Sequence, residues 1–274
     1  IRTGAVQFRM LPEMFRVLKS KPEIAPDGRR AISSLQAFMI SAAARIGTGN
    51  IIGVSIAISV GGPGAVFWMC VMAVVVWGAS FVESTLAQLY KVRHSTGYRG
   101  GPAYYIEKGL GQRWMAVLFA VVLLITFPLV FNAVQSNTIT GALANSAERF
   151  GTDTELGFSS MVGVGLVFLV GLVIFGGVRR IANTAQALIP FFAALYIVVG
   201  LFVMALNWRE IPGMFVLIVE SAFGIQEFAG AALGVVVIQG VRRGMFSNEA
   251  GLGSAPNAAA TAAVTHPVKQ GLVQ

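Results

Sequence analysis

Long apolar segments separated by short polar or glycine-rich connections make up most of this chain. No charged residue occurs between Ile46 and Val82, or between Trp114 and Ala147. An α-helix rises about 1.5 Å per residue, so about 20 apolar residues cross the hydrocarbon core of a bilayer. The pattern predicts an all-α integral membrane protein with about six spans within residues 33–241, at 33–60, 65–90, 114–147, 156–178, 181–208 and 214–241.

The first predicted span is interrupted at positions 47–50 by the run Gly47, Thr48, Gly49 and Asn50. Irregular backbone at membrane depth is tolerated where it is buried in protein or lines a cavity. The half-helix that follows would present its positive end to a carboxylate, and the half-helix that ends near Ile46 would present carbonyl oxygens to a small cation. We therefore expect a substrate at Gly47, Thr48, Gly49 and Asn50, and sodium at Ile46, Gly47 and Asn50. Close packing of helices at the glycines is the alternative.

Two further side chains are polar where the surrounding sequence is apolar. Gln135 in the third span could reach a bound amino group or ion, although hydrogen bonding between helices is the better explanation for a single residue of this kind. Glu83 is an acid inside the second span, where a functional role is the default reading. We expect Glu83 to pair with Arg45, which lies just before the break, as a structural brace; a position near the cytoplasmic interface is the alternative.

The ends of the predicted bundle are basic. Residues 4–20 place Phe8, Leu11, Phe15 and Leu18 at helical spacing, which indicates an amphipathic helix on a membrane surface or packed on protein. If the segment 1–32 is cytoplasmic, alternating spans place 17 of the 20 Lys and Arg residues on the cytoplasmic side. That partition fits the positive-inside rule and makes residues 242–274 a cytoplasmic connection followed by the start of another span.

Composition excludes several classes of protein. The chain is 55% hydrophobic and 12% charged, whereas about 25% of residues are charged in soluble domains. The net charge of +8 comes from short basic runs between apolar segments, so nucleic-acid binding is not expected. Cys70 is the only cysteine, and both histidines, His94 and His266, fall in predicted loops. We expect no enzyme, and no cofactor apart from a transported ion.

Four motifs together resemble a known family. They are Gly47-Thr-Gly-Asn-Ile51, Gly61-Gly-Pro-Gly-Ala-Val-Phe-Trp68, Gly100-Gly-Pro-Ala-Tyr-Tyr-Ile-Glu-Lys-Gly109 and Arg243-Gly-Met-Phe-Ser-Asn-Glu-Ala-Gly-Leu-Gly-Ser-Ala-Pro-Asn257. The chain resembles the alanine or glycine:cation symporters of bacteria and archaea, also called sodium:alanine symporters. The resemblance implies the 5+5 inverted-repeat fold of leucine-transporter-like carriers, with discontinuous helices and one extra leading helix.

The resemblance also assigns roles. It implies that the unwound backbone at 47–50 holds the substrate carboxylate and helps to ligate the ion, and that Gln135 faces the substrate. The region from Phe223 to Gly230 is similar to the family's second broken helix, which makes both residues substrate-binding candidates. Asn248 and Glu249, in the connection after the sixth span, would brace an inner gate.

The same resemblance implies a fragment truncated at both ends. The family's leading helix would precede Ile1, and core helices seven to ten would follow Gln274. Because the related fold takes part of its sodium ligation from the eighth core helix, the expected ion site is incomplete within these residues.

The sequence therefore predicts a multi-pass protein of the cell membrane, surrounded by lipid. It would carry out sodium- or proton-coupled symport of small neutral amino acids such as alanine or glycine. A passive channel or pore subunit is the alternative function. A break at mid-depth with an asparagine favours a closed pocket over a row of pore-lining residues.

Overall fold

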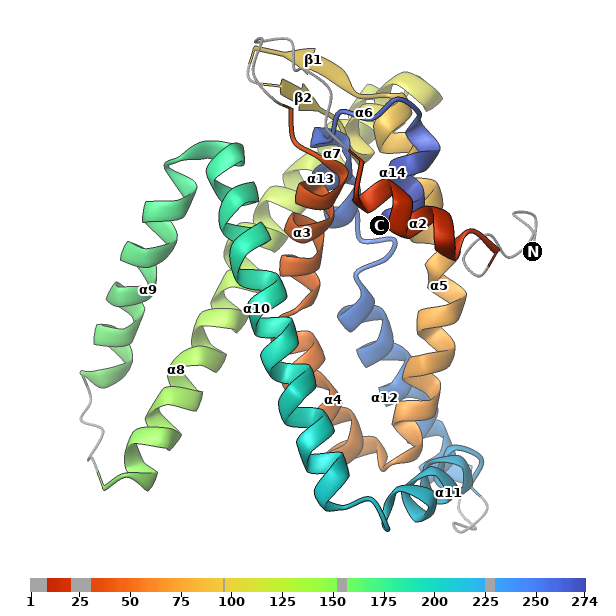
Figure 1. Ribbon diagram of the computed structural model, residues 1–274, viewed down its shortest axis with the longest axis vertical. Coiled ribbons are helices and arrows are strands. Elements are labelled where there is room, and N and C mark those ends of the chain that lie inside the picture. Colours follow the sequence, from red (N-terminus) through yellow and green to blue (C-terminus); the bar gives the residue numbers. More distant parts are fainter. Residues whose placement is uncertain (1–8, 21–30, 96, 152–156, 225–229) are drawn as a thin grey trace.

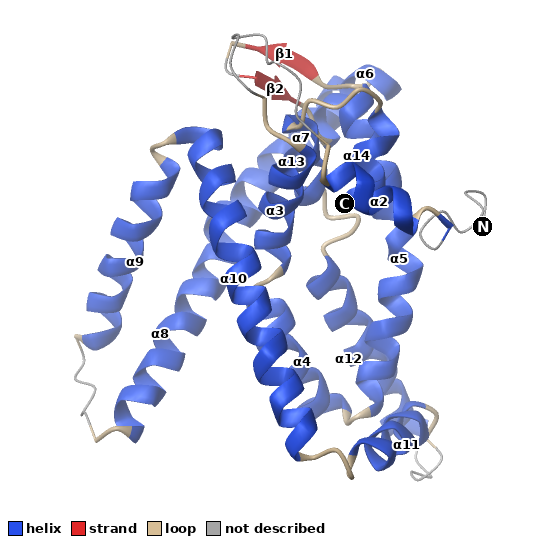
Figure 2. Ribbon diagram, in the orientation of Figure 1, coloured by secondary structure: helices blue, strands red, loops and turns tan. Residues whose placement is uncertain are grey.

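The computed structural model describes residues 9–20, 31–95, 97–151, 157–224 and 230–274. Within these residues the chain is helical apart from one small antiparallel hairpin, in which Val92 pairs with Arg99 (Figure 2). The elements are α2 (Leu11–Leu18), α3 (Ser34–Arg45), α4 (Thr48–Gly61), α5 (Gly64–Leu89), β1 (Val92–His94), β2 (Gly97–Arg99), α6 (Pro102–Leu110), α7 (Arg113–Ile125), the π-helix η1 (Thr126–Phe131), α8 (Asn132–Arg149), α9 (Phe158–Ile174), α10 (Gly177–Leu206), α11 (Ile211–Ala222), α12 (Gly230–Asn248), α13 (Ser254–Thr261) and α14 (Pro267–Val273).

Four helical segments of the described chain are long and apolar enough to cross a membrane. They are Ser34–Gly61, Gly64–Leu89, Arg113–Arg149 and Gly177–Leu206. The exposed side chains of α9 and α10, among them Val167, Phe168, Phe191 and Phe202, are mainly apolar, as a surface in contact with lipid requires. The prediction of an all-helical membrane protein is confirmed at this level.

Two predicted span boundaries are wrong because the charged residues that mark them lie within helices rather than between them. Arg179 and Arg180 lie in the first turn of α10, and the preceding turn falls at Phe175 and Gly176. Arg242 and Arg243 lie inside α12, which continues to Asn248, seven residues past the predicted end at 241. The long aliphatic part of an arginine can pack on a helix. Arg243 does so, since its Cδ lies 3.9 Å from the position that a Cβ on Gly53 would occupy.

The predicted sixth span, 214–241, consists of two helices in the described chain, which end and begin on either side of the second break predicted at 223–230. Helix α11 ends at Ala222, Gly224 adopts a left-handed conformation with φ of 66°, and α12 begins at Gly230. At 12 residues α11 is too short to cross a bilayer. Helix α11 instead packs on the start of α5, where the backbone N–H of Gly64 donates to Ser221 Oγ at 3.1 Å.

The third predicted span forms one helical segment with a changed geometry around its proline. Pro128 cannot donate a hydrogen bond within a helix, and its ring clashes with the preceding turn. The structure accommodates Pro128 in the π-helix η1, which joins α7 to α8. Segments of π-helix are often found at functional sites.

Helix α12 lies between α4 and α5 and holds them together (Figure 1). The approach to α5 depends on Gly240, because a Cβ there would lie 2.5 Å from Trp68 Cβ and 2.7 Å from the carbonyl oxygen of Ala65. Small residues allow helices in membranes to pack this closely. As a result, the last turns of α12 reach the start of α4.

A layer of short elements covers one end of the bundle, formed by α2, β1, β2, α6, α13 and α14 (Figure 1). The backbone N–H of Ala263 donates to the carbonyl oxygen of Ile32 at 3.1 Å, and Gln88 and Lys91 both donate to Ala262. Helix α2 packs on α14 and buries Val17, while Phe15 stays exposed. The turn between α9 and α10 lies at the same end, whereas α11 lies at the other.

Candidate functional site

The interruption of the first span is shorter than predicted. Helix α3 ends at Arg45 and α4 begins at Thr48, so only Ile46 and Gly47 are non-helical, with φ, ψ of −82°, 77° and −144°, −162°. Thr48, Gly49 and Asn50 form the first turn of α4 rather than an unwound segment. The break therefore exposes the N-terminal amides of α4, because the first turn of a helix has no intrahelical acceptors.

The break also changes which carbonyl oxygens are used. In a continuous helix the N–H groups of residues 47, 48 and 50 would donate to the carbonyls of residues 43, 44 and 46. Here they donate to Arg45 O, Gln135 Oε1 and Gly47 O. The carbonyl oxygens of Ala43, Ala44 and Ile46 thus lose their helical donors. Carbonyl oxygens of this kind suit a small cation.

Gln135 of α8 lies directly on the break. Its Oε1 accepts a hydrogen bond from the backbone N–H of Thr48 at 3.3 Å. Its Nε2 lies 2.5 Å from the position that a Cβ on Gly47 would occupy, so only glycine leaves room for this amide. Gln135 therefore occupies the position at the start of α4 where a ligand carboxylate would receive the same N–H group.

Asn50 joins three segments of the chain. Its Nδ2 donates to the carbonyl oxygen of Arg45 at the end of α3, and to the carbonyl oxygen of Ser247 in α12 at 3.5 Å. Its Oδ1 accepts a hydrogen bond from Ser247 Oγ. Asn50 thus links the two halves of the broken span to the end of α12.

Ser247 is a contact that the sequence did not predict. The sequence predicts a cytoplasmic connection from residue 242 onwards, which includes Ser247. In the structure Ser247 is the last residue but one of α12, and it contacts Asn50. The sequence carries no local signal for this contact, because the two residues are 197 positions apart.

Aromatic rings close the space beside the break. Phe131 of η1 stacks between Phe127 and Phe246, with ring centroids 4.8 and 5.2 Å apart. The Phe246 ring also approaches Gly49, at 3.0 Å from a Cβ built there. Between these rings, Gln135 and Ser247, a cavity of about 10 Å³ remains. A cavity of that size holds about one water molecule, so the site is closed in this structure.

The pairing expected between Glu83 and Arg45 is not present as a direct ion pair. Arg45 donates to Ser80 Oγ at 3.1 Å and to the carbonyl oxygen of Gln274 at 2.7 Å. Glu83 is buried and accepts from the backbone N–H of Gly251 at 3.1 Å. The positive charge of Arg45 still interacts at longer range with Glu83 and Glu249.

The turn after α12 contains Glu249, one of the two acidic residues that interact with Arg45 at longer range. Asn248 Oδ1 accepts from the backbone N–H of Ala250 at 3.3 Å, and Glu249 has a positive φ of 55°. Glu249 is buried and accepts from Ser254 Oγ at 2.7 Å. A non-glycine residue held at positive φ is uncommon outside Asn and Asp, and the hydrogen bonds on both sides keep it there.

Phe223 and Gly230 are not brought to the break. Phe223 follows α11 and packs edge-on against Phe67 and Trp68, with centroids 5.2 and 6.1 Å apart. Those rings lie at the start of α5, near the end of α4 that is opposite to the break. The 14 residues of α4 span about 21 Å at the helical rise. Gly230 begins α12, and it is the other end of α12 that contacts the first turn of α4 at the break. The region 225–229 lies outside the described residues.

The oxygen atoms at the break are the available ligands for a cation. Among the described residues there is no group of three or more His, Cys, Asp or Glu side chains able to hold a metal ion. A sodium ion prefers oxygen ligands, and backbone carbonyls with the Asn50 amide would supply them here.

The comparison with known proteins decides the family. The model of the sodium:alanine symporter family matches residues 1–274. The chain belongs to the sodium:alanine symporter family. The resemblance found in the sequence is confirmed, and the family is one of transporters rather than enzymes.

Relatives within the sodium:alanine symporter family carry different names. The chain is 54% identical over 273 residues to the probable sodium/glutamine symporter GlnT of Bacillus subtilis, and 51% identical over 274 residues to the amino-acid carrier protein AlsT of the same organism. It is 38% identical over 278 residues to the sodium/alanine symporter AgcS of Methanococcus maripaludis. These matches cover 100% of this chain but 55%, 56% and 59% of the relatives, so the chain spans little more than half their length.

Proposed function

We propose that this protein is a secondary active transporter that carries a small neutral amino acid together with sodium. The observation that carries the proposal is the break at Ile46 and Gly47, where the amide of Gln135 lies on the first N–H groups of α4. A substrate carboxylate would displace the Gln135 oxygen from Thr48 and bind at Gly47, Thr48, Gly49 and Asn50. Gln135 would then turn to the substrate's amino group.

Sodium would bind on the other side of the same break. Its ligands would be carbonyl oxygens of the region from Ala43 to Gly47, with Ile46 the most direct, and Asn50 Oδ1. That amide oxygen accepts from Ser247 Oγ in the closed site, so the ion competes with the contact between α4 and α12. Coupling follows if sodium and substrate each favour the same arrangement of these helices.

The charged groups beyond the break would form the inner gate. Arg45, Glu83 and Glu249 are all partly or fully buried, and they connect α3, α5 and the turn after α12. Opening a path to the cytoplasm would require these contacts to separate. The proposal includes the leucine-transporter-like fold. In it, the end of the bundle that is covered by the layer of short elements faces the cytoplasm, and the long apolar helices face lipid.

Uptake by the intact protein in proteoliposomes tests the proposal. Labelled alanine, glycine and glutamine would be supplied with an imposed sodium gradient, an imposed proton gradient, or neither. We expect at least one of the three labelled amino acids to accumulate above its equilibrium level when only the sodium gradient is imposed. Flux that merely equilibrates under every gradient would establish a passive pore and overturn the proposal.

The variant Gln135→Ala tests whether Gln135 contributes to substrate binding. Loss of one hydrogen bond of about 0.5–1.5 kcal/mol should weaken substrate binding by about three- to tenfold. Asn132→Ala, an exposed polar position on the same helix, should bind as the unmodified protein does. Equal affinity in all three proteins would remove Gln135 from the substrate site.

A further inference from the structure

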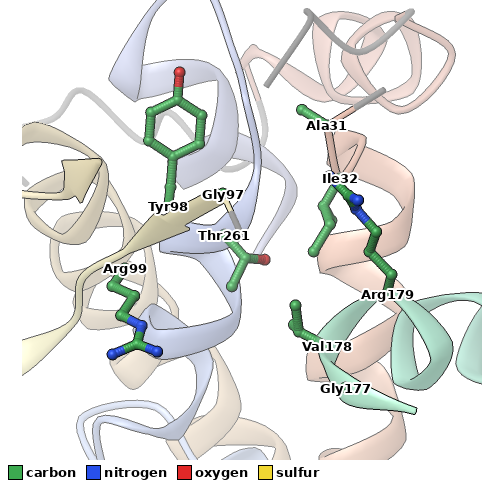
Figure 3. A pocket seen from close by; sticks show the side chains of 9 residues that line it. All are labelled: Ala31, Ile32, Gly97, Tyr98, Arg99, Gly177, Val178, Arg179 and Thr261. Atoms are coloured by element: carbon green, nitrogen blue, oxygen red, sulfur yellow. The ribbon is translucent and has the colours of Figure 1, made fainter. Parts of the chain in front are cut away.

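A basic chamber opens between the hairpin and the start of α10. It has a volume of about 380 Å³, and its walls come from β2, the residues before α3, the first turn of α10 and the end of α13. Figure 3 shows Arg99 on the wall formed by the hairpin and Arg179 on the opposite wall, with Thr261 and Val178 between them. The chamber is separate from the break in the first span.

The described residues that line this chamber carry positive charge and no negative charge. Arg99 and Arg179 are the charged lining residues. Guanidinium groups match the geometry of phosphate oxygens, to which they donate two parallel hydrogen bonds. An anion with a phosphate group therefore fits the chamber.

The chamber lies at the level where two spans begin. Ala31 and Ile32 immediately precede α3, and Gly177, Val178 and Arg179 begin α10. Both helices belong to segments long and apolar enough to cross the membrane. The ends of such helices leave the hydrocarbon core at the depth of the lipid headgroups.

An apolar cleft continues from this chamber. It has a volume of about 270 Å³, lies between α3, α10 and α13, and shares Val178 and Thr261 with the chamber. Ile40, Ile181 and Ala258 are among its lining residues. A soluble phosphate would leave this cleft unused, whereas an acyl chain would fill it. The two adjoining cavities match an amphiphile with an anionic head.

We propose that the chamber binds the phosphate headgroup of an anionic phospholipid and that the apolar cleft holds part of its acyl chain. The lipid phosphate contacts Arg99 and Arg179, and so ties the hairpin to α10. It also adjoins the contact between α3 and α10, where Gln36 Nε2 donates to Asn183 Oδ1 at 3.0 Å. Because α3 is the half-helix that precedes the break, the lipid stabilises the side of the candidate site that α3 forms. The proposal does not depend on which solute the protein carries.

The test measures lipid binding to the purified, delipidated intact protein by native mass spectrometry. The probes are dioleoyl phosphatidylglycerol, dioleoyl phosphatidylcholine and glycerol 1-phosphate. We expect phosphatidylglycerol to bind more tightly than phosphatidylcholine, and Arg99→Gln and Arg179→Gln each to weaken it by about fivefold. Arg93→Gln and Arg180→Gln remove the same charge from exposed neighbours that do not line the chamber, and should leave the affinity unchanged.

A second variant tests the cleft separately. Ile181→Trp fills the cleft without changing the charge, so it should weaken phosphatidylglycerol while leaving glycerol 1-phosphate unaffected. Equal weakening by the control arginine variants would show general surface attraction and overturn the proposal. Equal affinity for the two lipids would overturn it too. Glycerol 1-phosphate binding as tightly as phosphatidylglycerol, with Ile181→Trp silent, would show a site for soluble phosphate and reject the lipid.

Discussion

Gln135 Oε1 accepts a hydrogen bond from the backbone N–H of Thr48 at 3.3 Å, although the two residues are 87 positions apart in the chain. A side-chain amide from α8 thereby occupies the first turn of α4, where helix geometry leaves N–H groups without partners. The contact has a direct functional consequence. Under the proposed function, a carboxylate that binds the N–H group of Thr48 would replace the glutamine oxygen and release the Gln135 side chain.

Gly47→Ala should impair the site while preserving the fold. The added Cβ would lie 2.5 Å from Gln135 Nε2, so the methyl group would push away the amide that is proposed to turn to the substrate's amino group. We expect substrate affinity to fall by at least the amount caused by Gln135→Ala, with the melting temperature nearly unchanged. Equilibrium binding of labelled substrate and a thermal melt measure the two effects.

Gly53→Ala is the matched control for that variant. It adds the same methyl group to the same helix, where the nearest atoms would be 3.8 and 3.9 Å away. Alanine also has the higher helix propensity, so we expect equal or greater stability and unchanged binding. If Gly53→Ala reduced binding as much as Gly47→Ala, a general effect on α4 would account for both.

Asn50→Ala should destabilise the protein more than Ser247→Ala. Removing the amide leaves the carbonyl oxygen of Arg45 without its side-chain donor and also breaks both contacts to Ser247. The carbonyl oxygen of Arg45 keeps the N–H of Gly47 as a donor, so the expected cost is that of the lost hydrogen bonds, about 0.5–1.5 kcal/mol each. Ser247→Ala keeps the bond from Asn50 to Arg45. Thermal unfolding in detergent would rank the two variants, with Ser55→Ala, an exposed serine of α4, as the control.

The reverse ranking would contradict this account. A larger loss in Ser247→Ala would mean that the end of α12, rather than the join between α3 and α4, is what Asn50 stabilises.

Gly240→Ala should destabilise the packing of α12 on α5. The added Cβ would meet Trp68 Cβ at 2.5 Å and the carbonyl oxygen of Ala65 at 2.7 Å, and backbone atoms cannot move aside as a side chain can. Overpacking of this kind costs about 1–3 kcal/mol. Gly234→Ala in the same helix has no atom within 4 Å of the new methyl group and should be neutral. Similar melting temperatures for the two variants would show that α12 does not lie against α5 in this way.

Tyr105 should titrate at unusually high pH. Burial raises the pKa of Tyr105 in α6 to about 12, and the negative charge of Glu83 acts in the same direction. The unfolded value is about 10. Because the folded protein holds the proton more tightly, the stabilisation is complete below about pH 10 and is lost as the pH rises towards about 12. Ultraviolet absorbance of the phenolate, compared between the unmodified protein and Tyr105→Phe, measures the titration.

Tyr104→Phe removes the neighbouring phenol and serves as the control. The step near pH 12 should be missing from Tyr105→Phe and present in Tyr104→Phe. If Tyr105→Phe instead lost a step near pH 10, Tyr105 would be exposed to solvent rather than buried where α6 contacts α5.

The sequence by itself determined that the chain is an all-helical membrane protein, the region in which its first span breaks, and the family. These features are encoded locally: a span needs only enough consecutive apolar residues, and the run from Gly47 to Asn50 weakens a helix wherever it occurs. Gln135 could be singled out because an amide in an apolar segment requires a partner. The double arginines at 179 and 242 were misleading, because helical hydrogen bonding continues through charged residues.

Only the tertiary structure decided what meets the break. Ser247 and Phe246 reach α4 because Gly240 lets α12 pack tightly along α5, and Phe223 stays near Trp68 because α11 ends there. Such contacts join residues more than 150 positions apart, and no local pattern specifies them. Local hydrogen bonding and hydrophobicity decide where helices form, whereas the fit of side chains between helices decides which of their residues share a site.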